Sequence, residues 1–181
     1  MKNLVIGLFV LGLTSLGFSQ NTNSNVEEVK LESVTVTPRN LSYLDKVQDK
    51  SMSDHVKFLE DKASVYNVRE LPEFDGRKES FKTIFRGTKG YIIATYSNNG
   101  MILKTRERYS DIKLPKQLIK SVLSQYPNSD FLKVVYTVDY DHQKDVKKTY
   151  KIQIMKDNLI KNLKISSGGN IDKTVTMSIV N

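Results

Sequence analysis

The strongest structural signal in the chain is an alternation of apolar and polar residues interrupted by one turn sequence. Residues 91–97 (YIIATYS) and 101–109 (MILKTRERY) alternate with period two, and Asn98-Asn99-Gly100 lies between them. An Asn-Gly pair accepts the positive φ angles of a type I′ turn, so this pattern predicts a β-hairpin closed by such a turn. Alternation places Met101, Leu103, Thr105, Glu107 and Tyr109 on one face of the second strand, and Ile102, Lys104, Arg106 and Arg108 on the other.

Further strands and one clear helix surround this hairpin. Strand-like alternation recurs at residues 81–85, 131–140, 150–155, 159–165 and 175–179. Pro115 and Pro127 bracket a helix whose apolar stripe contains Leu118, Ile119, Val122, Leu123 and Tyr126. A short helix near residues 53–59 is a weaker indication. The pattern predicts an α+β fold, an antiparallel β-sheet with one amphipathic helix packed across one face.

The N-terminus predicts export. Lys2 precedes an apolar stretch from Leu4 to Leu16, and Gly17 and Ser19 suit cleavage before Gln20. A membrane anchor is the alternative, but this apolar stretch is shorter than the roughly 20 residues that a spanning helix needs. We expect a signal peptide at 1–19 and no membrane span once it is removed. The mature protein would be periplasmic or located at the cell surface or secreted.

The rest of the chain divides by composition. Residues 20–30 are polar and rich in Asn, which predicts a disordered leader. Residues 31–75 predict a first strand at 31–37 and a helical segment, either accessory or part of the main domain. The main α+β domain is expected at 76–181.

Charge and cysteine content restrict the functions open to the chain. The formal net charge is +8, and there is no cysteine, which excludes disulfides, thiolate metal sites and a cysteine nucleophile. Export disfavours nucleic acid as the partner of a basic protein, and we expect no nucleic-acid binding. Lipopolysaccharide phosphates, anionic lipids, acidic glycans and an acidic protein are alternative partners, and a merely solvated basic surface is another explanation.

Several short motifs occur along the chain. They are Ala94, Tyr96 and Gly100 at the hairpin tip, Leu114-Pro115 and Tyr126-Pro127 around the helix, and the turn Gly168-Gly169-Asn170. Over about residues 65–171 these motifs resemble the PepSY-like, or β-lactamase-inhibitor-protein-like (BLIP-like), domains that Bacteroidetes export. Asp157-Asn158 departs from this pattern, because such domains often carry glycine there, and no second full copy of the unit is recognisable. The resemblance implies an exported, non-enzymatic module that binds a protein or peptide and inhibits or regulates it.

Sequence motifs for catalysis, cofactors and metals are not found. There is no G-x-S-x-G, H-E-x-x-H, P-loop or G-x-G-x-x-G pattern, and the chain has only two histidines. Asp139, Asp141, His142 and Asp145 could hold a cation, but the lysines around them favour a solvated turn. We therefore predict no catalytic residue, cofactor or metal. A hydrolase whose site is hidden from sequence motifs is the least favoured reading.

A basic strand face is the candidate binding surface. Lys104, Arg106 and Arg108 alternate along one strand, and Lys133 and Lys151 oppose apolar rows in later strands. If these strands share a sheet, the cations line the face that the helix leaves open, with Tyr91 nearby. Arg and Tyr are favoured in binding hot spots. We therefore expect these six residues to contact a protein or peptide, or alternatively envelope anions such as lipopolysaccharide or acidic glycan.

Overall fold

The computed structural model describes residues 39–77 and 79–178. The expected signal peptide, leader and first strand at 31–37 lie outside these residues. The described residues belong to one compact unit, and everything below concerns them.

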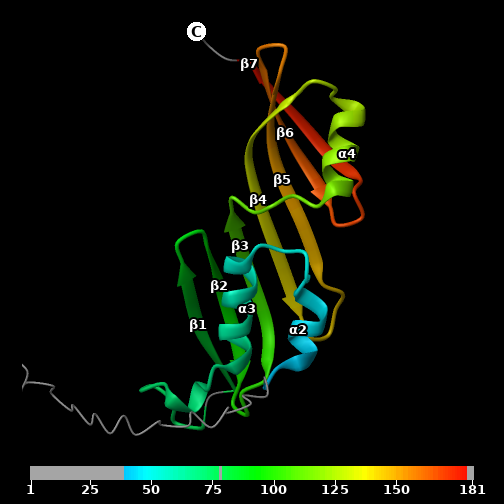
Figure 1. Cartoon of the computed structure of the whole chain (residues 1–181). Coiled ribbons are helices and arrows are strands. Elements are labelled where there is room, and N and C mark those ends of the chain that lie inside the picture. Colours follow the sequence, from blue (N-terminus) through cyan, green and yellow to red (C-terminus); the bar gives the residue numbers. More distant parts are fainter. Residues whose placement is uncertain (1–38, 78, 179–181) are drawn as a thin grey trace, which may run out of the picture. The chain divides into compact units, whose positions relative to one another are not determined.

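A single antiparallel sheet organises this unit (Figure 1). Its seven strands follow one another in chain order, and each pairs with its sequence neighbours. The antiparallel α+β architecture predicted from the sequence is therefore confirmed. The strands are β1 (Ser80–Gly87), β2 (Gly90–Ser97), β3 (Ile102–Ser110), β4 (Asp130–Asp141), β5 (Lys147–Lys156), β6 (Leu159–Ser166) and β7 (Ile171–Ser178).

More helices accompany the sheet than the clear one and the weaker one expected. They are α2 (Leu41–Val47), α3 (Asp54–Val65), the short 3₁₀ helix η1 (Val68–Glu70) and α4 (Lys116–Gln125). Figure 1 shows α3 beside β1 to β3 and α4 beside β5 to β7. The weak helical indication near 53–59 coincides with α3, which extends further and whose apolar stripe is interrupted by the buried polar residues Glu60 and Ser64.

Helix α4 follows the sequence pattern closely. Leu118 and Val122 are buried, whereas Leu123, at the edge of the predicted stripe, is exposed. Pro115 is the N-cap residue and not the first helical one, a shift of one residue that is common at helix ends. At the other end, the Tyr126 hydroxyl lies 3.1 Å from the Thr174 hydroxyl of β7.

One continuous apolar core joins the helices to the sheet. It includes Tyr43 and Val47 of α2, Leu59 of α3, Val122 of α4 and Ile152 of β5. Three tyrosines cross its centre: the ring centroids of Tyr109 and Tyr136 are 6.1 Å apart, and those of Tyr136 and Tyr150 are 4.8 Å apart. Residues 41–68 thus contribute to the same core as the strands.

Two details of the strand prediction were wrong. The 98–100 turn is not type I′, because only Gly100 has a positive φ, 87°, and a three-residue loop with a glycine at its end closes the hairpin instead. The type I′ pattern occurs at Asp157-Asn158, where both φ angles are positive, 51° and 58°. A register shift at Thr95/Tyr96 also turns Ile102 inward, so that it is buried and not on the cationic face.

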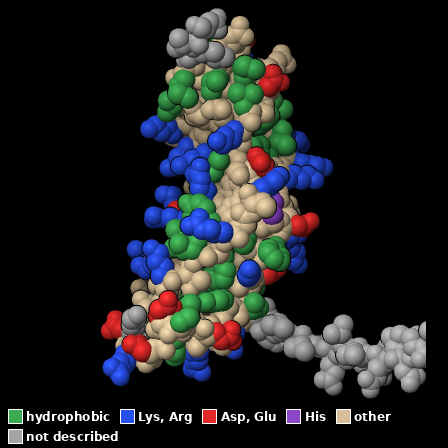
Figure 2. All heavy atoms as spheres, turned by 90° about the vertical axis from the view of Figure 1, so that its left-hand side faces the viewer, with side chains coloured by type: hydrophobic (Ala, Val, Ile, Leu, Met, Phe, Trp, Pro, Cys, Tyr) green, Lys and Arg blue, Asp and Glu red, His purple; other side chains and the backbone are tan. Residues whose placement is uncertain are grey.

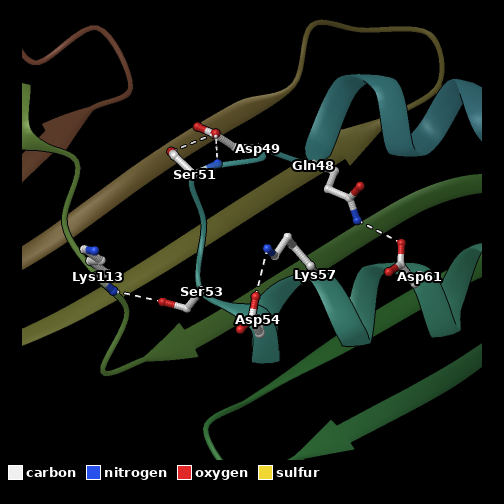
Figure 3. A network of polar contacts seen from close by, with 8 residues as sticks. All are labelled: Gln48, Asp49, Ser51, Ser53, Asp54, Lys57, Asp61 and Lys113. Atoms are coloured by element: carbon white, nitrogen blue, oxygen red, sulfur yellow. Dashed lines mark hydrogen bonds and ion pairs between the residues drawn. The ribbon is translucent and has the colours of Figure 1, made fainter.

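The connection between α2 and α3 is held by polar contacts (Figure 3). Gln48 Nε2 donates to Asp61 Oδ1 at 2.8 Å, and the Ser51 amide and hydroxyl both donate to Asp49 Oδ1 at 2.8 Å. Ser53 precedes α3, and its hydroxyl accepts a bond from the Lys113 amide at 3.0 Å. This bond fastens the start of α3 to the segment that leads into α4.

Candidate functional site

The sheet has one face packed against the helices and one uncovered face. Strand register assigns Phe85, Ile92, Tyr109 and Tyr136 to the packed face, and all four are buried. Alternate residues point the other way and are mostly exposed or half-buried. Figure 2 shows one side of the molecule, where many lysine and arginine side chains gather across the middle, with acidic ones scattered from top to bottom.

All six residues predicted as a binding face lie on the uncovered face. Tyr91 is opposite Arg108, and Arg106 lies between Ile93 and Asp139 in the neighbouring strands. Lys104, Lys133 and Lys151 share that face by the same alternation. The six fall into two groups, one on β2 and β3 and the other on β4 and β5. Their role in binding stays a prediction.

Lys104 and Arg106 of the first group line a groove over β1 to β4, which we call the mixed-charge groove, whereas Tyr91 and Arg108 are not part of its lining. Its volume is about 470 Å³. Lys104 Nζ lies 3.3 Å from Asp141 Oδ2, and Arg106 Nε lies 3.3 Å from Asp139 Oδ1. The residues that line it are Lys82, Ile93, Thr95, Lys104, Thr105, Arg106, Asp139, Tyr140, Asp141, Lys144, Asp145 and Lys147.

The Asp141 carboxylate of this groove is held ionised and in place. The Gln143 amide donates to Asp141 Oδ1 at 3.1 Å. This bond, followed by Lys104, keeps the pKa of Asp141 below its ordinary value. Two cross-strand ion pairs therefore present fixed charges of both signs beside Ile93.

The second group borders another groove over β4 to β7, which we call the lysine groove. Its volume is about 380 Å³, and four lysines line it: Lys133, Lys151, Lys164 and Lys173. Val135, Ile152, Leu163 and Val175 supply apolar lining, and Gln153 donates to Asn162 at 3.1 Å across it. No acidic residue lines this groove.

Sequence reasoning missed half of the lysine groove and the pairing in the other groove. Lys164 and Lys173 alternate with buried or core-facing residues, so the period-two signal was present. However, only the register of β5, β6 and β7 shows that they are neighbours of Lys151. Asp139 and Asp141 were assigned to a solvated turn, yet they end β4 and pair with β3.

A third cluster of polar groups is buried beneath α2 and α3. Glu107 is completely buried and accepts three hydroxyl bonds. Tyr43 and Thr105 each donate to Oε1 at 2.7 Å, and Tyr109 donates to Oε2 at 2.8 Å. Burial raises the pKa of Glu107, although these hydrogen bonds oppose the rise. Because the Glu107 carboxyl is enclosed by these groups, the cluster stabilises the fold and is not a binding site.

Glu60 lies near Glu107 in the same buried region. Burial first, and the Glu107 charge second, raise the pKa of Glu60 to about 9. Within the described residues, Glu60 Oε2 has no hydrogen-bond partner. A carboxyl in such surroundings is neutral at physiological pH.

The described residues contain no group of three or more His, Asp or Glu side chains placed to hold a metal ion. His142 Nδ1 lies 3.7 Å from Asp141 Oδ1 and 3.2 Å from the Leu103 carbonyl. Among residues 39–77 and 79–178, no helix is long and apolar enough to cross a membrane.

Comparison with known proteins gives one structural similarity. No protein-family model and no curated protein match the sequence. Among solved structures, the chain is similar to a BLIP-like protein from Bacteroides fragilis. The two are 13 % identical with a TM-score of 0.32, and the match covers 57 % of this chain and 79 % of the other.

Proposed function

We propose that this chain is an exported, non-enzymatic binding module whose uncovered sheet face engages a partner protein. The observation that carries the proposal is the mixed-charge groove, where two ion pairs on neighbouring strands flank apolar surface. Ile84 of β1 lies next to this groove, opposite its lining residue Ile93, and is 47 % exposed. Apolar surface beside charges held on a rigid sheet is suited to protein recognition, because apolar burial supplies affinity and fixed charges supply specificity.

The finer parts of the proposal come from the sequence. They are the signal peptide at 1–19, the PepSY-like character, the Bacteroidetes origin, a location in the periplasm or at the cell surface, and inhibition or regulation of the bound protein. The described residues contain no helix that could span a membrane, and export is compatible with this. Neither histidine hydrogen-bonds a serine hydroxyl in the described part of the chain, and we do not propose a hydrolase.

Capture from an envelope extract, with matched variants, tests the proposal. The bait is the chain from Gln20, which contains every described residue, washed at high salt so that contacts made by charge alone are lost. A stoichiometric partner should be retained by the parent and lost with Ile84→Asp and with Arg106→Glu. It should be retained with Lys120→Glu, a charge reversal on the exposed surface of α4.

The contrary results are specific. If Ile84→Asp and Arg106→Glu capture the same protein as efficiently as Lys120→Glu does, the mixed-charge groove is not the contact surface. If no protein is retained by the parent chain at any salt concentration, the partner-protein function is wrong.

A second candidate, binding of envelope anions, is favoured by the lysine groove, which has no acidic residue in its lining.

A further inference from the structure

Three lysines form a direct row across neighbouring strands. Lys151 of β5 is opposite Lys164 of β6, which is opposite Lys173 of β7. Paired residues on adjacent strands have Cβ atoms roughly 5 Å apart, and like charges in such positions destabilise a sheet. The lysine row is therefore an arrangement that the sheet itself does not favour.

Nothing in the described residues neutralises this row. Lys133, Lys151, Lys164 and Lys173 form no ion pair within residues 39–77 and 79–178. In the mixed-charge groove of the same face, by contrast, Asp141 and Asp139 neutralise Lys104 and Arg106. Repulsion between unpaired like charges is expected where a surface is adapted to bind an external ligand. Because these charges are positive, the ligand would be anionic.

The same face becomes apolar along the strands. The next row beyond the lysines contains Gln153, Asn162 and Val175. The one after it contains Met155, Ile160 and Met177 on β5 to β7, and the exposed Asp130 of β4 is opposite Met155. Val175 and Met177 are 44 % and 48 % exposed. Because a strand rises about 3.3 Å per residue, the apolar row lies roughly 13 Å from the lysine row.

A further exposed apolar side chain lies at this end of the sheet: Leu132, next to the register shift in β4, is 45 % exposed. A cationic row and an apolar row side by side on one face suit a lipid surface, where anionic headgroups and the upper acyl chains are both within reach of a docked face.

We infer that the uncovered face of β4 to β7 docks on an anionic phospholipid surface. The four lysines contact lipid phosphates, and Met177, Val175 and the neighbouring apolar side chains enter the boundary between headgroups and acyl chains. A soluble anion or an acidic protein segment would account for the lysine row but would not require the apolar row. This binding is separate from the partner protein proposed above, which uses the other groove.

Vesicle flotation tests this inference directly. The chain from Gln20, free of the apolar stretch at 4–16, is mixed with phosphatidylcholine vesicles that contain either no or one third phosphatidylglycerol. We expect binding only to the anionic vesicles. Each lysine near an anionic surface contributes about 1 kcal/mol, so the triple variant Lys151→Gln/Lys164→Gln/Lys173→Gln should bind on the order of 100-fold more weakly.

Two matched variants separate charge count from position and test the apolar row. Lys62→Gln/Lys116→Gln/Lys120→Gln removes the same charge from exposed helix positions and should bind nearly as the parent does. Val175→Ser/Met177→Ser keeps all lysines, and it should weaken binding roughly 10-fold by removing apolar contact. Circular dichroism of each variant verifies the fold.

Three results would overturn the inference. Equal weakening by the two triple-lysine variants would show that only net charge matters. An unchanged affinity of Val175→Ser/Met177→Ser would show that the apolar row does not enter the bilayer. Full displacement from vesicles by millimolar inorganic phosphate would identify a free-phosphate site instead. None of these results would contradict the proposed function, because capture of a partner protein through Ile84 and Arg106 is measured separately.

Discussion

Glu107 and Glu60 are ionisable residues that the fold encloses, one on β3 and the other on α3. Glu107 is stabilised by hydroxyl donors from Tyr43, Thr105 and Tyr109. Glu60 has fewer compensating contacts, since its Oε2 lacks a partner among the described residues. Burying a carboxyl without such partners favours its protonated form, so the two glutamates make the stability of the fold depend on pH.

The sign of this dependence follows from the direction of the Glu60 shift. In the unfolded chain Glu60 ionises near its ordinary pKa of 4.5, whereas in the folded protein it ionises at about 9. Between these values the folded state holds a proton that the unfolded state has lost. The free energy of unfolding therefore falls as pH rises from about 4.5 to about 9, by about 1.4 kcal/mol per pH unit for one such group.

We predict that Glu60→Gln makes the free energy of unfolding less dependent on pH. Between pH 6 and pH 8 the slope should become shallower by about 1.4 kcal/mol per pH unit, because the amide has no proton to lose. Urea unfolding at several pH values measures this. The groups that face Glu60 electrostatically, which the substitution leaves in place, are Glu107, Lys148, Asp61 and Asp49.

Glu73→Gln is the control for this experiment. Because Glu73 is exposed, this substitution should leave the pH dependence of the free energy of unfolding unchanged. If Glu60→Gln also leaves the slope unchanged, Glu60 is ionised in the folded protein and the cluster is not neutral as inferred.

At the level of elements, the pairing of β2 with β3 depends on one glycine. A Cβ at Gly90 would lie 2.6 Å from the Arg108 carbonyl oxygen and 2.6 Å from Tyr109 Cδ1. Gly90 therefore leaves the space in which the Tyr109 ring lies, and that ring position lets the Tyr109 hydroxyl reach Glu107. The strand contact and the buried carboxyl are coupled through this tyrosine.

We predict that Gly90→Ala lowers the free energy of unfolding by about 2 kcal/mol, within the range typical of overpacked sites. Either the β2–β3 register or the Tyr109 ring must shift to accommodate the methyl group. Gly168→Ala is the matched control, since a Cβ there meets nothing within 4 Å, and a change below about 0.5 kcal/mol is expected. Equal effects of the two substitutions in urea unfolding would show that the space at Gly90 is not needed.

Strong periodicity made the strands and α4 predictable, and its local failures explain what was missed. Helix α2 spans only two turns, and the buried side of α3 includes the polar residues Glu60 and Ser64, so both give a weak apolar pattern. Register shifts at Thr95/Tyr96 and Phe131/Lys133 reverse the face of the residues beyond them, and alternation alone gives no sign of a bulge.

The candidate site shows the same limit. Alternation placed Lys104, Arg106, Arg108, Lys133 and Lys151 on one face, in agreement with the structure's register. It could not show which charges oppose one another across strands. The ion pairs to Asp139 and Asp141, and the row completed by Lys164 and Lys173, depend on pairings between segments that are distant in sequence.

At the scale of the whole described unit, the sheet is continuous although its two ends differ in their helices and charges. Helix α3 accompanies β1 and β2, α2 contacts β4 near the middle of the sheet, and α4 accompanies the β7 end (Figure 1). The pairing of β3 with β4 joins them, and the tyrosine row from Tyr109 through Tyr136 to Tyr150 crosses that junction inside the core.

Because one core spans both ends, we predict that the unit unfolds in a single cooperative transition. Hydrogen exchange followed by mass spectrometry at increasing urea should show β2 and β5 losing protection with the same midpoint and the same slope. Tyr136→Ala, which removes the central ring of the tyrosine row, should lower both midpoints together, with a loss of about 3–5 kcal/mol as for large aromatic truncations.

The alternative is that α2 and α3 stabilise one end of the sheet, that α4 stabilises the other, and that the two ends unfold independently. In that case Tyr136→Ala would leave one of the two strands protected at urea concentrations where the other exchanges. Leu123→Ala, at an exposed position of α4, controls for the effect of any apolar truncation and should change neither midpoint appreciably. A cooperative result would mean that the mixed-charge groove and the lysine groove belong to one folding unit, so that a partner bound at either groove stabilises the other.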